Sequence, residues 1–192
     1  HGCRQSLVEG LQKSVNMSFL GKTGVVFGFG YAGKGCALAL KSLGMHVYVV
    51  EVDPIRAQEA ILMGFFVASK REACRIADVL VTATGCTKVV TGSDFGIMKD
   101  GVILVNAGHG DMEIDSKYLC KHPLLVRERI NDFTERFVVP WGKCVYLLCE
   151  GRLANLAAGG GHPPEVMSVT FTLHFLAIME LLNNPSDYQR GQ

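Results

Sequence analysis

Residues 24–35 have the sequence Gly-Val-Val-Phe-Gly-Phe-Gly-Tyr-Ala-Gly-Lys-Gly, and this stretch decides the fold. An apolar run precedes three glycines in the spacing G-x-G-x-x-G, at Gly28, Gly30 and Gly33, and a segment of helical length follows them. This order predicts a buried strand at about 24–28, a tight turn, and a helix at about 32–43.

The three glycines each have a separate physical task in such a turn. Gly28 permits the tight bend, Gly30 lets the backbone approach a diphosphate, and Gly33 lets the helix pack closely against the strand. The start of the helix then offers unpaired amides and a partial positive charge to the diphosphate. Tyr31 and Ala32 lie between the second and third glycines of the same loop, and we predict that they also contact the ligand.

The same glycines also match the beginning of a phosphate-binding P-loop, which would continue through Lys34. Gly35 occupies the next position, where that loop needs a Ser or Thr hydroxyl to hold magnesium. A site for a nucleoside triphosphate is therefore the weaker interpretation, and a dinucleotide site is the stronger one.

An acidic residue, Glu51, ends the second predicted strand. A carboxylate in that place accepts hydrogen bonds from an adenosine ribose and repels a 2′-phosphate, which favours NAD over NADP. Arg56 keeps the choice open, because a nearby arginine can neutralise a 2′-phosphate. We predict that Glu51, its neighbour Val52, and Arg56 all contact the cofactor.

Short apolar runs alternate with helix-length segments from Thr23 onward, which is typical of parallel strands joined by crossover helices. We therefore expect an α/β fold: a Rossmann-type doubly wound parallel sheet with helices on both faces, plus N- and C-terminal helices that would link to a substrate domain outside the chain. The predicted units are an N-terminal linking helix (1–20), the NAD-binding Rossmann domain (21–160), and a C-terminal helix and tail (161–192).

The individual elements follow from the same alternation. Strands are predicted near 24–28, 46–51, 65–68, 78–83 and 102–106, and helices near 3–18, 32–43, 54–63, 70–76 and 93–99. Beyond Asp115 the pattern weakens, and we expect a helix near 115–121, extended runs at 124–129 and 144–149, and a long apolar helix at about 164–182.

Composition excludes several kinds of function. The 19 basic and 18 acidic residues give a net charge of +1 and are scattered, so nucleic acid is not an expected partner. A hydrophobic content of 48% without a continuous apolar run of membrane-spanning length predicts a soluble protein and no membrane partner. The seven cysteines form no C-x-x-C pair, so we expect reduced thiols, a cytoplasmic location and no metal site. The opening without Met predicts a piece of a longer protein.

Two turns of small residues follow the fourth and fifth predicted strands, at Thr82-Ala83-Thr84-Gly85-Cys86 and Asn106-Ala107-Gly108-His109. Open α/β sheets bind ligands at the carboxyl ends of their strands, so both turns are predicted to lie beside the nicotinamide half of the cofactor. His109 suits proton transfer near neutral pH, although a loop histidine bonded to backbone is an equal alternative. His162 is more simply interpreted as a turn residue, because no strand end positions it.

Taken together, these residues resemble S-adenosylhomocysteine hydrolase over nearly the whole chain. The Glu-Gly-Arg-Leu and Gly-His-Pro elements are not shared with dehydrogenases in general. The matching segments are Gly2-Cys3-Arg4 with Ser6-Leu7, Gly33-Lys34-Gly35-Cys36-Ala37, Glu51-Val52-Asp53-Pro54-Ile55, Thr84-Gly85-Cys86, Asn106 with Gly108-His109 and Glu113-Ile114-Asp115, Glu150-Gly151-Arg152-Leu153 with Asn155-Leu156, and Gly161-His162-Pro163.

The resemblance implies a mechanism in which tightly held NAD oxidises the 3′-hydroxyl of the substrate ribose and so acidifies the C4′ proton. Homocysteine then leaves, water adds, and the ketone is reduced again, so that the net reaction is reversible hydrolysis of the small-molecule substrate to adenosine and homocysteine. On this basis Thr84 and Asn155 would contact the nicotinamide portion, and Cys3 would lie beside it. His109 and His162 would face the reacting sugar.

The resemblance also implies what the chain lacks. The family's proton-transfer lysine and aspartate, its adenosine-binding domain and its C-terminal tail are not among these residues, so we expect the isolated chain to bind NAD without turning over substrate. Tyr31, Ala32 and Arg56 depart from the family pattern and leave room for a non-catalytic, hydrolase-like regulatory protein. A third interpretation, the cofactor domain of a 2-hydroxyacid-type dehydrogenase, does not explain Glu150 to Leu153. The apolar helix at 164–182 predicts a homo-oligomer.

Overall fold

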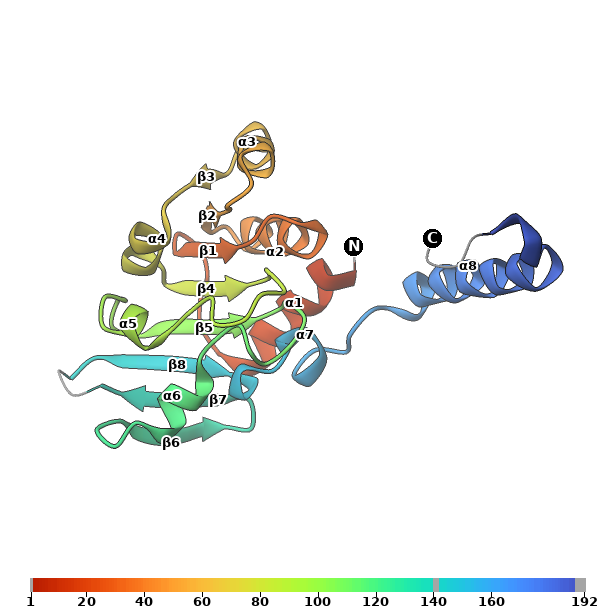
Figure 1. Cartoon of the computed structure of the whole chain (residues 1–192). Helices are drawn as coiled ribbons and strands as arrows, with labels where there is room; N and C mark the ends of the chain where they lie inside the picture. The colour runs from red at the N-terminus through yellow and green to blue at the C-terminus, as the bar shows by residue number, and fades with distance from the viewer. Residues whose placement is uncertain (1, 140–141, 189–192) are drawn as a thin grey trace.

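The computed structural model describes residues 2–139 and 142–188 and is centred on an eight-stranded sheet (Figure 1). The strand order is β3-β2-β1-β4-β5-β8-β7-β6. The first six strands of that order are parallel, and β7 and β6 complete one edge as an antiparallel hairpin. The strands are β1 (Thr23–Phe27), β2 (His46–Val50), β3 (Phe66–Val67), β4 (Val79–Thr82), β5 (Val102–Asn106), β6 (Val126–Asn131), β7 (Thr134–Val138) and β8 (Cys144–Leu148).

Helices cover both faces of the sheet, as predicted. One core lies beneath α1 (Gly2–Ser14), α2 (Tyr31–Ser42), α3 (Pro54–Leu62) and α7 (Ala154–Ala157), and the other beneath α4 (Lys70–Ile76), α5 (Gly92–Phe95) and α6 (Ser116–Lys121). Successive residues of β5 alternate between the two cores: Ile103 and Val105 enter the first, and Val102 and Leu104 the second. Burial on both faces explains why the parallel strands have nearly continuous apolar sequences.

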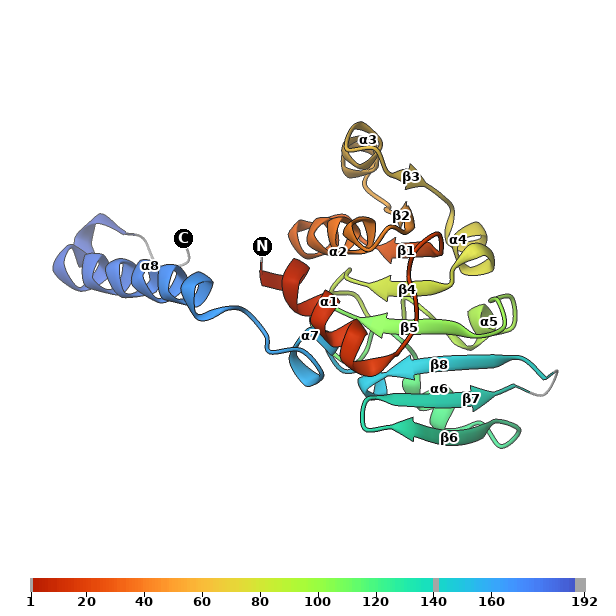
Figure 2. The ribbon, with the colours of Figure 1, turned by 180° about the vertical axis from the view of Figure 1, so that it is seen from behind.

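The carboxyl ends of the parallel strands face one side of the molecule. The start of α1 and the segment that follows α7 lie on this same side (Figures 1 and 2). From β1 the sheet extends to β2 and β3 in one direction and to β4 and β5 in the other. Such a reversal of strand order is where open α/β sheets bind their ligands.

The β6–β7 hairpin differs from the sequence-based expectation, in which β7 was absent. All six residues of β6 are exposed, so this edge strand has no apolar alternation by which a sequence pattern could reveal its partner. Ion pairs across the hairpin, Arg127 with Glu135 and Arg136 with Glu128, join the two strands instead.

Helix ends differ as well. Helix α1 ends at Ser14, not near residue 18, because the side chains of Asn131 and Thr134 donate hydrogen bonds to the Ser14 carbonyl oxygen. The predicted helix at 93–99 is the single turn α5, and the short helix α7 was not predicted. Two 3-10 turns, Cys149–Gly151 and Pro185–Asp187, complete the described elements.

The predicted long apolar helix is α8 (Pro164–Asn183), which extends away from the sheet and its covering helices (Figures 1 and 2). Among the described residues it buries none of its own side chains. It is also the one helix in the described ranges that is long and apolar enough, by length and composition, to cross a membrane. This finding qualifies the expectation that the chain contains no such segment.

Candidate functional site

The glycine turn between β1 and α2 is as tight as its spacing predicts. Gly28 has a φ of +92°, and a Cβ atom at Gly33 would lie 2.0 Å from the Gly28 carbonyl oxygen. Glycine is therefore required at both positions. Gly30 is different, because the nearest atom to a Cβ there would be Nη1 of Arg56, at 3.7 Å. The space above Gly30 is open to a ligand.

Helix α2 begins directly after Gly30, which caps it without a side-chain hydrogen bond. The first amides of a helix have no acceptor within the helix, and its aligned peptide dipoles add partial positive charge at this end. Unpaired donors beside open space above a glycine fit a diphosphate group.

Glu51 faces the glycine turn from the end of β2. Its Oε2 accepts a hydrogen bond of 2.7 Å from the Phe29 amide, and its Oε1 accepts bonds of 2.7 Å from Val52 and 3.0 Å from Asp53. Partial burial raises the pKa of Glu51, but the three backbone hydrogen bonds and the nearby Arg56 guanidinium bring that pKa below its ordinary value of 4.5. The carboxylate is therefore charged and fixed, and its remaining lone pairs suit ribose hydroxyls.

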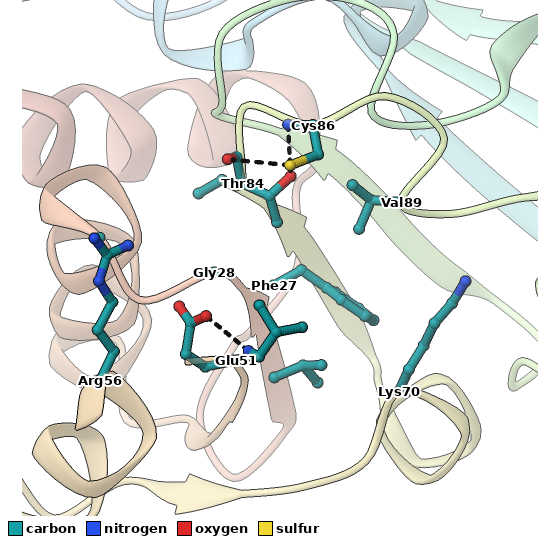
Figure 3. Close-up of a pocket in the computed structure, with 12 residues that line it drawn as sticks. Phe27, Gly28, Glu51, Arg56, Lys70, Thr84, Cys86 and Val89 are labelled. Carbon is teal, nitrogen blue, oxygen red and sulfur yellow. Dashed lines mark hydrogen bonds between the residues drawn. The ribbon is translucent and has the colours of Figure 1, made fainter. Parts of the chain in front are cut away.

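A cavity of about 440 Å³ opens between the glycine turn, the end of β2 and the turn after β4 (Figure 3). Its size and its mostly apolar walls suit part of a dinucleotide. Residues from three strand ends meet here, as the sequence predicts. The lining consists of Gly28, Gly30, Glu51, Val52, Arg56, Ala83, Thr84 and Cys86, which were predicted, and Phe27, Val50, Lys70 and Val89, which were not.

Tyr31 does not line this cavity. Its side chain is 98% exposed, and it borders a smaller cavity of about 170 Å³ together with Lys34 and Arg56. The Lys34 ammonium lies 5.8 Å from the centre of the Tyr31 ring and donates a 2.5 Å hydrogen bond to Glu59. The ring therefore leaves the larger cavity open.

The turn after β4 is held by a buried carboxylate that the sequence analysis did not select, Glu113. The amides of Thr84 and Gly85 donate hydrogen bonds of 3.0 Å and 2.8 Å to it, and the Thr84 hydroxyl donates one of 2.7 Å. Glu113 lies between two other acidic residues, Asp111 and Asp115, and nothing in the sequence distinguishes it from them. Only the fold shows which of the three is buried.

Asn106, at the end of β5, organises the neighbouring turn. Its Oδ1 accepts hydrogen bonds from the Thr82 hydroxyl at 3.2 Å and from the Gly108 amide at 2.9 Å, while its Nδ2 donates to the carbonyl oxygens of Gly110 and, at 2.9 Å, Gly151. Thr82 is fully buried and supports Asn106 instead of lining the cavity. Ala107 is likewise buried, whereas His109 is exposed.

Cys3 and His162 meet on the same side of the sheet. The Sγ of Cys3 lies 3.6 Å from Nε2 of His162, and a Cβ on Gly2 would lie only 1.8 Å from the His162 ring. The start of α1, not a strand end, positions this histidine. The sequence did not predict this contact, because 159 residues separate Cys3 from His162 along the chain.

Asn155, in α7, has a buried polar atom without a partner. Its Oδ1 finds no hydrogen-bond donor among the described residues, although the side chain is buried. An unsatisfied buried acceptor is unfavourable by about 1–3 kcal/mol, so such an atom is commonly a site where a ligand or an ordered water donates a hydrogen bond. A carboxamide such as that of nicotinamide offers the missing donor. The described residues contain no cluster of side chains that could hold a metal ion.

Solved structures share the fold. A dipicolinate synthase component from Bacillus halodurans superposes with a TM-score of 0.57 over 62% of this chain and 41% of its own, at 18% identity. A D-lactate dehydrogenase from Salmonella superposes with a TM-score of 0.50 over 62% of this chain and 42% of its own, at 22% identity. At these identities the likeness concerns the fold alone.

Sequence comparison is more specific. The S-inosyl-L-homocysteine hydrolase of Methanopyrus kandleri is 44% identical over 100% of this chain and 45% of its own length, and the adenosylhomocysteinase of Nostoc sp. is 42% identical over the same shares. The adenosylhomocysteinase of Saccharolobus solfataricus is 45% identical over 96% of this chain and 44% of its own length. The chain thus spans less than half the length of these relatives. Residues 1–161 match the family described as "S-adenosyl-L-homocysteine hydrolase, NAD binding domain", and the chain belongs to this family.

Proposed function

We propose that the chain is the cofactor half of an enzyme that reversibly hydrolyses S-adenosylhomocysteine to adenosine and homocysteine. The chain alone binds NAD, and turnover requires the longer protein to which it corresponds. The proposed organisation is a linking helix (1–20), the NAD-binding domain (21–160), and a C-terminal helix and tail (161–192). Residues 1, 140–141 and 189–192 of these segments lie outside the described ranges.

The contact between Cys3 and His162 is the observation that supports this proposal most. Both residues come from segments that resemble the hydrolases, and the Gly-His-Pro element of His162 is not shared with dehydrogenases in general. The two side chains meet at 3.6 Å. A thiol and an imidazole so placed suit proton transfer at a sugar held against the cofactor.

Each part of the crevice has a role in this proposal. The α2 amides hold the diphosphate, Glu51 holds the adenosine ribose, and Thr84 and Asn155 hold the nicotinamide end. Bound NAD supplies a hydride acceptor that later returns the hydride. The remaining proposed contacts are Gly28, Gly30, Tyr31, Ala32, Gly33, Val52, Arg56, Ala83, Gly85, Cys86, Ala107, Gly108 and His109. Thr82, which was also predicted, would act through its hydrogen bond to Asn106.

Proton transfer is assigned to three side chains. Cys3, His109 and His162 face the substrate ribose, and the two histidines exchange protons with it near neutral pH. The exposure of His109 and His162 leaves both rings accessible to a substrate that approaches from outside the chain.

Calorimetric titration of the chain with NAD and NADP, side by side, tests the cofactor assignment. We expect saturable binding of NAD and weaker binding of NADP, because the charged Glu51 repels a 2′-phosphate. Adenosine release is then measured for the chain and for a full-length protein that contains it. Adenosine release by the full-length protein and not by the isolated chain supports the proposal. Measurable adenosine release by the isolated chain contradicts it.

The base of the substrate is a separate question, because the relative from Methanopyrus kandleri is named an S-inosyl-L-homocysteine hydrolase. We assign the adenosyl substrate. An assay of the full-length protein with both thioethers tests this choice, and faster turnover of the inosyl compound would reverse it.

A regulatory, non-catalytic protein is the second candidate, and the exposed Tyr31 ring favours it because an aromatic side chain beside the cofactor loop can contact a partner protein. A full-length protein that binds NAD but hydrolyses neither thioether would establish it.

We also propose that the protein is a cytoplasmic homo-oligomer and that α8 contributes to the contact between its copies. The apolar residues of α8 lie on several faces and are exposed in the single chain, so they require cover. A monomer in light scattering contradicts this assignment. Recovery with membranes instead of the soluble fraction contradicts the location.

A further inference from the structure

The buried carboxylate of Glu113 has no role in the site as proposed so far. Its side chain is 1% exposed, and within residues 2–139 and 142–188 its carboxyl group accepts hydrogen bonds from donors on Thr84 and Gly85 alone. A carboxyl group that accepts from three donors and donates to none has the bonding pattern of the ionised form. Glu113 therefore places a negative charge inside the protein.

That charge is held in one place. A Cβ on Gly108 would lie 1.5 Å from Oε1 of Glu113, so the carboxylate fills the space that a side chain at position 108 would occupy. The turn after β4 grips the group through three hydrogen bonds, and the turn after β5 packs directly against it. A group confined in this way keeps its position whether or not a ligand is bound.

The charge lies toward the β5 side of the crevice, because Glu113 contacts Gly108 in the turn after β5 as well as Thr84 and Gly85 in the turn after β4. Glu51 ends β2, on one side of the strand-order reversal, and Glu113 joins the turns after β4 and β5, on the other. A dinucleotide placed with its adenosine ribose at Glu51 brings its nicotinamide ring to the β4–β5 side. Cys36 lies near this carboxyl group: burial first, and then the charges of Cys3 and Glu113, raise the pKa of its thiol to about 12.

The nicotinamide ring changes its charge during the reaction. The oxidised ring is a cation, and addition of a hydride, two electrons with a proton, makes it neutral. A fixed negative charge in a site shielded from water stabilises the cation and has little effect on the neutral ring. On the basis of the proposed function, we propose that Glu113 is a positioning residue that makes the site hold NAD⁺ more tightly than NADH.

The test compares the affinities of the chain for NAD⁺ and NADH, by calorimetry and by NADH fluorescence. Glu113→Gln keeps the shape of the side chain and removes its charge. We expect it to weaken NAD⁺ binding relative to NADH binding by about tenfold, because only the oxidised ring carries the charge that Glu113 attracts. An equal change in both affinities would show that Glu113 is only a structural support.

Glu113→Asp is the matched control, because it keeps the charge and shortens the reach to Thr84 and Gly85. We expect both affinities to fall together, with their ratio unchanged. If Glu113→Asp changed the ratio of NAD⁺ to NADH affinity as much as Glu113→Gln, the proposal would be overturned. Loss of the contacts with Thr84 and Gly85 would then explain both results.

A second measurement needs no variant and so does not depend on the folding of Glu113→Gln. The unaltered chain is titrated with benzamide adenine dinucleotide, in which a neutral phenyl ring replaces the pyridinium. We expect NAD⁺ to bind about tenfold more tightly than this neutral analogue. Equal binding of the two defeats the inference about Glu113 and leaves NAD binding intact, whereas failure of the unaltered chain to bind NAD⁺ at all defeats the proposed function as well.

Discussion

The Sγ atom of Cys3 lies 3.6 Å from Nε2 of His162, although 159 residues separate the two along the chain. Gly2 makes this contact possible, because a Cβ at position 2 would overlap the imidazole ring at 1.8 Å. The start of α1 therefore limits the positions that the His162 ring can occupy. Helix α1 is itself fixed, because Leu7 and Leu11 pack in the core beneath α2.

Gly2→Ala should displace the His162 ring while leaving the fold intact, because an exposed ring can rotate away from the added methyl group. In a full-length protein that contains the chain, we expect kcat to fall at least tenfold, with NAD affinity within about a factor of two of the unaltered protein. His46→Ala is the control, because this exposed histidine lies at the amino-terminal end of β2, and the change should alter neither quantity. Unchanged kcat in Gly2→Ala would remove His162 from the proposed site.

Two glycines of the same turn should respond differently to alanine. In Gly33→Ala the new methyl group meets the Gly28 carbonyl oxygen, so we expect a loss of about 1–3 kcal/mol in the free energy of unfolding. Gly30→Ala meets only the tip of Arg56, so stability should stay within about 0.5 kcal/mol while NAD affinity falls at least tenfold. Thermal unfolding and calorimetric titration separate the two effects. Undiminished NAD binding by Gly30→Ala would place the diphosphate elsewhere.

The sequence could predict the part of the site formed by the glycine turn and Glu51, because these residues lie close together along the chain. The turn, the helix start and the carboxylate of Glu51 lie within one strand-helix-strand unit, and spacing alone determines which residues meet. The turns after β4 and β5 are predictable from the sequence as well, because the carboxyl ends of parallel strands share an edge.

The remainder of the site depends on contacts between distant segments. Glu113 is one of three acids in a short run, and the fold alone selects it as the group that holds Thr84. Likewise, Cys3 and His162 come from opposite ends of the chain, so no spacing relates them. Strand β7 was not predicted for a related reason: it pairs with β6, whose residues are all exposed, and ion pairs such as Arg127–Glu135 cross the hairpin, so its sequence has little apolar alternation.

Glu51 should make stability depend on pH in the acidic range. Its pKa in the folded chain lies below the ordinary value of 4.5, so the folded state releases the proton more readily than the unfolded state. The resulting stabilisation is fully present above about pH 4.5 and is lost as the pH falls through the lower pKa of the folded protein. We expect the melting temperature of the unaltered chain to exceed that of Glu51→Gln by a constant amount above pH 4.5. If the difference in melting temperature between the unaltered chain and Glu51→Gln did not shrink below pH 4.5, the charge of Glu51 would not be the source of the stabilisation.

Asn155 should contribute to NAD binding and not to the stability of the free chain. Its Oδ1 has no partner among the described residues, so Asn155→Leu removes an unsatisfied buried acceptor and keeps a similar volume. We expect an equal or higher melting temperature without NAD, and an NAD affinity at least tenfold weaker. A lower melting temperature combined with unchanged NAD affinity would mean that the side chain serves packing alone.

Alkylation of the cysteines should report on the occupied crevice. Burial raises the pKa of the Cys36 thiol to about 12 and that of Cys74 to about 11, so both should remain unmodified by iodoacetamide at pH 8, since the thiolate is the reactive form. Cys86 and Cys120 are exposed and should react. Cys86 lines the 440 Å³ cavity, whereas Cys120 lies in α6, on the other side of the sheet from α2. Saturating NAD should therefore slow the labelling of Cys86, as measured by peptide mass spectrometry, and leave that of Cys120 unchanged. Equal protection of both would indicate a general tightening of the fold instead of a cofactor in this cavity.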